Sequence, residues 1–230
     1  TPGAVILAPT GIEGATVNGN TQYWQLEDLT WDCRGLGDPG SGANCVSINW
    51  RPGPQEAPEA TSHIALRRIA LTHVANPPGS HSTGIQAFAN DVTIEDFTMD
   101  GTSIQDGDYQ GSHCMYVAGS RQVFRRGTLR NCGGYGIQRN DTDMTWTQGN
   151  RGNQIVDIRI EDAGRRASGS RGCLALYHNQ QGVLVAGVTC VRSRSQGMLV
   201  EGKGSTGHVL VHNTIVGSAT RCLSGGSDAS

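Results

Sequence analysis

Residues 92 to 99 read Val-Thr-Ile-Glu-Asp-Phe-Thr-Met, two apolar pairs separated by a polar break. Within each pair the apolar residues are two apart, Val92 with Ile94 and Phe97 with Met99, which is the side-chain period of a β-strand. The break predicts a bend that returns the second pair to the interior already used by the first. The segment therefore predicts two short strands that share one core.

The same pattern recurs along the whole chain at intervals of about 26 to 40 residues, most of them near 30, and a period of this size is typical of a stacked array. The copies begin at Trp24, Ile64, Val92, Phe124, Ile155, Val183 and Val209. The copy at Phe124 is the weakest, because Gly127 replaces an apolar residue. Helical periodicity is absent, so we expect an all-β chain.

A second pair of apolar residues precedes each copy, as in Val46 with Ile48 and Met115 with Val117. In four cases a small residue directly precedes this second set of apolar residues, namely Gly84, Cys114, Gly136 and Gly197. Three short strands per turn, wound about seven times, explain both the apolar pairs of each copy and the apolar residues that precede it. We expect one domain over residues 1–230, with a loop insertion at 34–60 and a tail at 222–230. The sequence opens without a methionine or a signal peptide, which fits a processed secreted protein and equally a piece of a larger one. No amphipathic helix precedes Val5, so we expect either a missing cap or a partner chain at this end.

This arrangement resembles the single-stranded right-handed parallel β-helix of pectate-lyase-like polysaccharide lyases, glycoside hydrolases and phage tailspikes. The resemblance implies an all-β fold of about seven coils. It also implies that the face formed by one strand column and its loops is a saccharide groove. Fold does not fix activity, so the function has to be argued from the residues on that face.

Composition excludes several classes of protein. The net charge of −2 gives no nucleic-acid signal, and no apolar run is long enough to span a membrane. Seven cysteines favour an oxidising compartment, secreted or at the cell surface, and their odd number leaves at least one unpaired. We expect a bridge between Cys33 and Cys45, and we interpret Cys190 as a small buried apolar residue.

The 18 basic residues include one lysine, Lys203, and the rest are arginines. The planar guanidinium suits carboxylates, which favours acidic sugars as ligands, although a coding bias would give the same composition.

Two acidic loops are candidate sites. Asp106 and Asp108 lie in a glycine-containing loop, and Asp141 and Asp143 repeat that spacing on the next coil. Carboxylates in such loops could bind calcium or act as acid and base, and the alternative is that both are solvated turns.

The loops containing these aspartates enter and leave neighbouring strands, so we expect them to border one groove. Outward side chains of Gln86, Tyr116 and Gln138 would form its floor. His113 or Tyr116 would act as the base, and Arg139 would bind a uronate carboxylate. A structural histidine and a surface ion pair are the alternatives for His113 and Arg139. Tyr177, His178 and Lys203 would extend the sugar-binding surface.

These observations predict an extracellular protein that cleaves an acidic polysaccharide by β-elimination. The alternative is a non-catalytic structural or carbohydrate-binding segment of a surface appendage, fibre or tailspike, which would assemble as a homo-oligomer or end to end. A glycoside hydrolase that uses paired aspartates is a third hypothesis. Calcium is the expected cofactor, polysaccharide the expected partner, and neither nucleic acid nor a membrane is expected.

Overall fold

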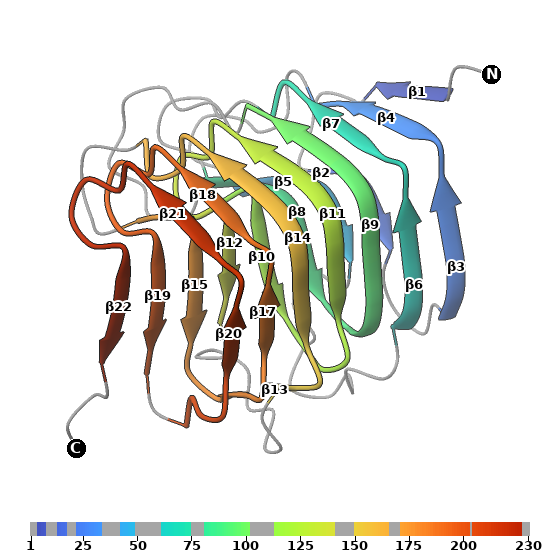
Figure 1. Cartoon of the computed structure of the whole chain (residues 1–230). Helices are drawn as coiled ribbons and strands as arrows, with labels where there is room; N and C mark the ends of the chain where they lie inside the picture. The colour runs from blue at the N-terminus through green and yellow to red at the C-terminus, as the bar shows by residue number, and fades with distance from the viewer. Residues whose placement is uncertain are drawn as a thin grey trace.

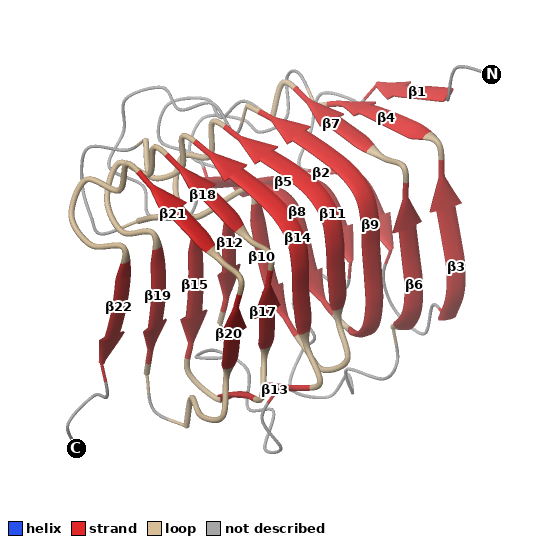
Figure 2. Cartoon of the chain, viewed as in Figure 1, coloured by secondary structure: helices blue, strands red, loops and turns tan. Residues whose placement is uncertain are grey.

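The computed structural model describes residues 4–7, 13–17, 22–33, 42–48, 61–74, 81–101, 113–140, 150–165, 171–202 and 204–226. Every regular element in these ranges is a β-strand, and every pairing between them is parallel (Figure 2). The prediction of an all-β chain is therefore confirmed. No helix in the described part of the chain is long and apolar enough to cross a membrane.

The strands form three faces. Face A contains β3 (Gln22–Glu27), β6 (Ser62–Arg67), the first halves of β9 (Asn90–Asp100), β11 (Val123–Arg130) and β14 (Gln154–Glu161), then β17 (Leu184–Ala186) and β20 (Val209–Val211). Face B contains β1 (Ala4–Leu7), β4 (Leu29–Asp32), β7 (Ala70–Thr72), the second halves of β9, β11 and β14, then β18 (Thr189–Val191) and β21 (Thr214–Val216). Face C contains β2 (Glu13–Val17), β5 (Gly42–Ile48), β8 (His81–Phe88), β10 (Met115–Ala118), β12 (Ile137–Arg139), β15 (Leu174–Tyr177), β19 (Met198–Glu201) and β22 (Leu223–Gly226).

The chain visits faces A, B and C in the same order again and again, and we call one such passage a circuit (Figure 1). One 12-stranded sheet bends to form faces A and B, and an 8-stranded sheet forms face C. The short pair β13 (Asn150–Arg151) and β16 (Gln180–Gln181) lies between C and A. Each strand pairs with its equivalent one circuit later, so residues about 30 apart in sequence lie side by side.

The bend between faces A and B occurs where the polar break predicts it. The second residue of each break has a positive φ, for example 54° at Asp96 and 53° at Arg126, directly after the last residue of face A. A left-handed residue in mid-strand turns the chain without interrupting the parallel pairing of β9 with β11 on either side. The A–B corner is therefore a column of left-handed residues, namely Asp28, Arg68, Asp96, Arg126, Asp157, Gly187 and His212.

The core lies between the three faces and consists of inward columns of stacked apolar side chains. Leu66, Ile94, Phe124, Ile155 and Val185 form one such column on face A, and all five are fully buried. Burial of each such side chain contributes about 1.5 to 3 kcal/mol to the stability of the fold. Gly127 fits this scheme, because a β-carbon there would collide with the ring of Phe97 on the preceding circuit.

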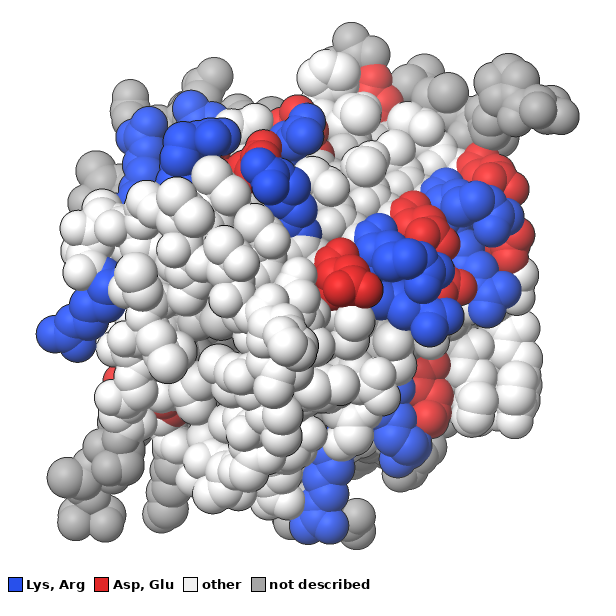
Figure 3. Space-filling view, viewed as in Figure 1, with Lys and Arg blue, Asp and Glu red and all other residues white. Residues whose placement is uncertain are grey.

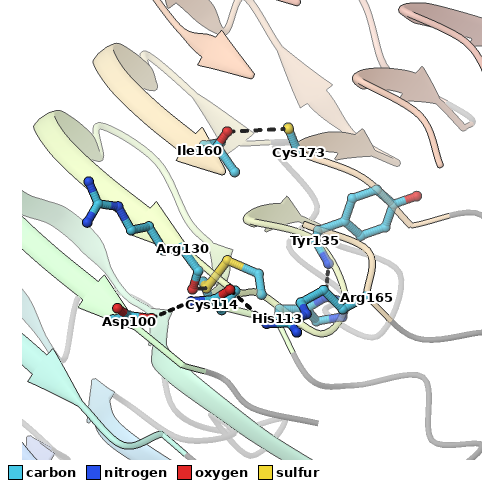
Figure 4. Close-up of a disulfide and its surroundings, with 10 residues drawn as sticks. Asp100, His113, Cys114, Arg130, Tyr135, Ile160, Arg165 and Cys173 are labelled. Carbon is cyan, nitrogen blue, oxygen red and sulfur yellow. Dashed lines mark hydrogen bonds between the residues drawn. A yellow bond between two sulfur atoms is a disulfide. The ribbon is translucent and has the colours of Figure 1, made fainter. Parts of the chain in front are cut away.

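Three disulfides tie face C to face B or to the corner between them, and their members are 12, 18 and 17 residues apart in sequence. Figure 4 shows the one formed by Cys114. The predicted bridge between Cys33 and Cys45 is confirmed, and the other two are Cys114–Cys132 and Cys173–Cys190. The interpretation of Cys190 as an unbridged core residue is wrong. Cys190 does occupy a buried core column, but that column faces the start of β15, where Cys173 reaches it.

Two expected irregular regions contain strands. β5 lies within the interval 34–60, where its Val46 and Ile48 continue the apolar column of face C. β22 lies within 222–230 and pairs with β19, so the tail begins later than expected. The remainder of both intervals lies largely outside the described residues.

Candidate functional site

The outward side of face C places the three predicted floor residues in one row. Tyr116 is the register partner of Gln86 on one side and of Gln138 on the other. Gln86 and Gln138 are each only 7% exposed, and Tyr116 is half-buried. The row that we call the polar strip (Ser47, Gln86, Tyr116 and Gln138) therefore exists, but it is not the open floor that we expected.

Polar contacts hold part of this strip in place. Asn44 Nδ2 donates to Gln86 Oε1 at 2.5 Å, and Asn140 Nδ2 lies 3.4 Å from the Tyr116 hydroxyl. Within the part of the chain that the structure describes, no hydrogen bond satisfies Ser47 Oγ or Gln138 Oε1, and both atoms are buried. Buried polar atoms without partners are rare in folded proteins, and because both atoms are covered they are not open to a ligand in this structure.

His113 precedes β10 and is buried. Its Nδ1 accepts a hydrogen bond from the backbone N–H of Tyr135 at 3.0 Å, so in the neutral ring the proton is on Nε2 (Figure 4). The ring stacks on Tyr135, with centroids 5.8 Å apart, and its centroid lies 5.7 Å from that of Tyr116. His113 is next to Tyr116 as predicted, but one of its two nitrogens serves the backbone, which favours the structural alternative.

Tyr135 and Tyr177 form the second part of the site. Their hydroxyl oxygens are 2.9 Å apart, and the guanidinium carbon of Arg171 lies 5.6 Å from the centre of the Tyr135 ring. Burial, followed by the hydrogen bond with Tyr177, raises the pKa of Tyr135 far above its ordinary value of 10. Tyr135 therefore remains a neutral phenol at any physiological pH and cannot act as a base there.

Tyr177 and His178 lie where an extended sugar surface was predicted. Tyr177 follows the core residues of β15, and its ring stacks on that of His178 with centroids 6.0 Å apart. Both side chains are half-buried. Together with Tyr116 and Phe88, which contact edge to face at 5.2 Å, they make the outer side of face C rich in aromatic side chains.

The side chain of Arg139 does not face the outer side of face C, where a uronate would bind. Its side chain points inward from β12, in the column of Val117 and Leu176, and is fully buried. It donates from Nε to Gln180 Oε1 at 3.0 Å, from Nη1 to Gln122 Oε1 at 2.8 Å and from Nη2 to the carbonyl oxygen of Gly119 at 2.8 Å. Arg139 is therefore part of a buried polar layer, neither a uronate ligand nor half of a surface ion pair. Strand alternation from the outward Gln138 already indicates this.

Five of the predicted site residues, Asp106, Asp108, Asp141, Asp143 and Lys203, lie outside the described residues. Among the residues that are described, no group of three or more His, Cys, Asp or Glu side chains could hold a metal ion. The calcium site and the paired acids thus stay predictions.

Two groups of arginines stand out from the rest, and the first forms a charge ladder along the A–B corner (Figure 3). Glu95 is buried and makes ion pairs with Arg67 at 2.7 Å, Arg125 at 2.6 Å and Arg126 at 2.9 Å. Burial alone would raise its pKa, but hydrogen bonds from Arg125 and Arg126 outweigh burial and hold the pKa below 4.5. The ladder consists of Glu27 with Asp28, Arg67 with Arg68, Glu95 with Asp96, and Arg125 with Arg126, on four successive circuits.

The second group, which we call the basic patch (Arg165, Arg194 and Arg221), lies where the chain passes from face B to face C. Arg165 donates to Asn131 Oδ1 at 2.7 Å, and Arg221 Nη1 lies 3.4 Å from Ser224 Oγ. In the described part of the chain none of the three forms an ion pair with a carboxylate, and all three are exposed. Neighbouring Asp162 is already bound by Arg192, which lowers its pKa, and Arg165 and Arg194 lower it further from a distance.

The basic patch adjoins face C, since Ser224 belongs to the outward column that contains Ala175 and Leu199. An anion lying along this edge would meet exposed guanidinium groups that form no ion pair within the described residues. Sequence reasoning identified the arginine bias but did not distinguish these residues from the ladder. The distinguishing signal is position in the repeat, because the ladder arginines occupy the polar break between the two apolar pairs and the patch arginines follow the second pair.

Comparisons of the chain with protein-family models, curated proteins and solved structures find no match.

Proposed function

We propose that this chain is a right-handed parallel β-helix of about seven coils that acts outside the cell and binds an acidic polysaccharide along face C. The observation that carries the proposal is the basic patch, three exposed arginines that form no ion pair within the described residues. They lie at the edge where the chain enters face C, and the outer side of this face carries aromatic side chains. Guanidinium groups recognise carboxylates or sulfates, and aromatic rings give sugar rings a flat apolar contact. Three disulfides support an oxidising, extracellular setting.

Cleavage by β-elimination is the chemistry that we propose for this surface. A base removes the proton next to the uronate carboxylate, and the glycosidic oxygen leaves with the electron pair of its bond. Tyr116 is the candidate base, because it is half-buried while His113 Nδ1 and Tyr135 are both committed to structural hydrogen bonds. Calcium at Asp106, Asp108, Asp141 and Asp143 would hold the substrate carboxylate.

A non-catalytic polysaccharide-binding module is the second candidate. The inward placement of Arg139 and the structural hydrogen bond of His113 favour it, because they remove two of the expected catalytic roles. The two candidates share the binding surface and differ only in whether Tyr116 does chemistry.

The binding experiment compares two charge-neutralising variants of exposed arginines. Arg165→Gln/Arg194→Gln should weaken binding to a polyuronate about tenfold, because each lost contact contributes about 0.5 to 1 kcal/mol. Arg126→Gln, which removes a ladder arginine, should leave the affinity within a factor of about two. Equal binding of a neutral glycan or of DNA by the wild type, or equal effects of both variants, would contradict the proposal.

The activity experiment follows the ultraviolet absorbance of the unsaturated product with and without a chelator. Under the lyase proposal Tyr116→Phe abolishes the signal while polyuronate affinity is retained. Binding without any unsaturated product identifies the module instead.

A further inference from the structure

Two tyrosine hydroxyls meet on the outer side of face C. Tyr135 lies shortly before β12, and Tyr177 ends β15, the strand that pairs with β12. Their hydroxyl oxygens are 2.9 Å apart, and their rings are inclined at 76° to each other. Tyr135 is fully buried together with Ala175 and Leu199, whereas Tyr177 packs against this cluster and stays half-buried. The pair therefore connects a covered phenol to one that is partly open to solvent.

The surroundings of Tyr135 decide which of the two hydroxyls donates. A phenol carries one proton and its oxygen can also accept hydrogen bonds, whereas a guanidinium group can only donate. The Arg171 guanidinium lies over the Tyr135 ring, 5.6 Å from its centre, and hydrogen-bonds to the Tyr135 hydroxyl, whose oxygen is therefore the acceptor. Donation from Tyr135 to the Tyr177 oxygen keeps the covered proton hydrogen-bonded. The opposite direction would turn that proton toward the apolar side chains of Ala175 and Leu199.

Tyr135 also keeps its proton. Burial, and after it the hydrogen bond with Tyr177, raises the pKa of Tyr135 far above its ordinary value of 10, and the nearby Arg171 lowers it only in part. Tyr135 is thus a permanent donor, and the Tyr177 oxygen is its acceptor. The proton of Tyr177 is thereby directed away from Tyr135.

The ring of Tyr177 is held in place by the next circuit. It stacks on His178 with centroids 6.0 Å apart and the rings only 20° from parallel. The backbone N–H of His178 donates to the carbonyl oxygen of Glu201 at 3.1 Å, and its own carbonyl oxygen accepts from Gln180 Nε2 at 3.1 Å. Gly202 approaches so closely that a β-carbon there would collide with the His178 ring and backbone. The Tyr177 hydroxyl is therefore preorganised.

We propose that Tyr135 is a positioning residue that makes Tyr177 a hydrogen-bond donor to an oxygen atom of the bound acidic polysaccharide. The inference rests on the proposed function of face C and adds the atom and the direction of one contact. In the described part of the chain Tyr135 is the only hydrogen-bond partner of the Tyr177 hydroxyl. A carboxylate oxygen is the strongest acceptor that an acidic sugar offers to this proton.

Fluorination tests the direction of the contact. Fluorine withdraws electrons from a phenol, so 3-fluorotyrosine in place of Tyr177 has a stronger O–H donor and a weaker acceptor oxygen. Polyuronate affinity at about pH 6, where phenols are neutral, should rise about twofold. The same replacement of Tyr23, an exposed residue of β3 on face A, should leave the affinity unchanged. An unchanged or lowered affinity on fluorination of Tyr177 would overturn the proposal.

A double-mutant cycle tests the role of Tyr135. Tyr177→Phe should lower polyuronate affinity about fivefold, because one hydrogen bond to the ligand is lost. Tyr135→Phe should lower it about threefold in the wild type and not at all in the Tyr177→Phe background, because Tyr135 acts through Tyr177. Losses that add in the double variant would show that Tyr135 has only an independent structural role, which contradicts the proposal.

A measurement without ligand separates this inference from the proposed function. The covered Tyr135 hydroxyl should give a slowly exchanging proton resonance that is absent in Tyr135→Phe and shifted in Tyr177→Phe. If the Tyr135 hydroxyl instead exchanges fast, the donor direction is wrong even where polyuronate binds. A wild type that shows the slow resonance and binds no polyuronate overturns the proposed function, and with it the ligand named here, but retains the donor direction.

Discussion

One outward column of face A changes character halfway along the molecule. On four successive circuits it carries Glu27, Arg67, Glu95 and Arg125, and on the next three it carries Val156, Ala186 and Val211. The charged half is neutralised by pairing between circuits, whereas the apolar half leads to an end that nothing in the described chain covers. The same position thus carries ion pairs between circuits in one region and apolar side chains in the other.

The arginines of the ladder and of the basic patch also differ, in the partners of their guanidinium groups. Those of the ladder have carboxylate partners one circuit away, as Arg126 has in Asp96 at 2.7 Å, and they contribute to the register of the circuits. Those of the basic patch are exposed beside face C with hydrogen bonds to neutral side chains. The exposed arginines therefore include one group that is paired within the fold and another that has no carboxylate partner among the described residues.

The largest difference between the two regions should be seen in the core. Leu174→Ala, in the covered part of its column, should lower the free energy of unfolding by about 3 kcal/mol, because it leaves a cavity. Leu223→Ala, at the open end of that column, should cost less than about 1 kcal/mol in the monomer. Urea unfolding of both variants at low protein concentration measures the difference. Equal costs would show that the last circuit is covered even in the monomer.

A smaller effect is expected in the ladder. Glu95→Gln removes a buried carboxylate that pairs with three arginines and should cost about 2 kcal/mol, between the values for exposed and fully buried pairs. Glu201→Gln on β19, which forms no ion pair within the described residues, serves as the control and should be close to neutral. Equal losses of stability in Glu95→Gln and Glu201→Gln, measured by urea unfolding, would contradict this role of Glu95.

The smallest effect is expected in the dependence of stability on low pH. Hydrogen bonds from Arg126 and Arg68 hold the pKa values of Asp96 and Asp28 below 3.8, the ordinary value of an aspartate. A lowered folded-state pKa means that their stabilisation is present above about pH 4 and is lost as the pH falls further. Asp96→Asn should therefore be less stable than the wild type at neutral pH and nearly equal to it near pH 2. Unfolding midpoints across this range test the sign, and a gap that widens on acidification would contradict it.

Much of the fold could be predicted from sequence because strand alternation and the polar break are local features. The two-residue period of Val92 with Ile94 and the break at Glu95 and Asp96 are read directly, and the structure places the bend there. Register followed from the repeat length, which brought Gln86, Tyr116 and Gln138 into one row. The bridge between Cys33 and Cys45 was accessible because its members are close in sequence.

The site was less predictable because burial and pairing depend on neighbouring circuits. Gln138 and Arg139 are adjacent in sequence, yet one points outward and the other lies in a buried polar layer. The bridge from Cys173 to Cys190 required knowing which core column faces which strand start. The charge ladder was present in the sequence as Glu-Asp and Arg-Arg breaks in alternation, but its meaning depends on stacking.

The ladder repeats with the same period as a column at the start of the face C strands. This cysteine column consists of Cys45, Gly84, Cys114, Gly136, Cys173, Gly197 and Cys222. Acidic and basic breaks alternate from one circuit to the next, and so do cysteine and glycine, so both patterns repeat only every second circuit. Deleting one circuit would bring acid against acid and place two glycines or two cysteines side by side. Removing or duplicating two circuits together would preserve both alternations. We therefore expect the fold to tolerate the loss or duplication of two circuits together, about 60 residues, better than the loss or duplication of one.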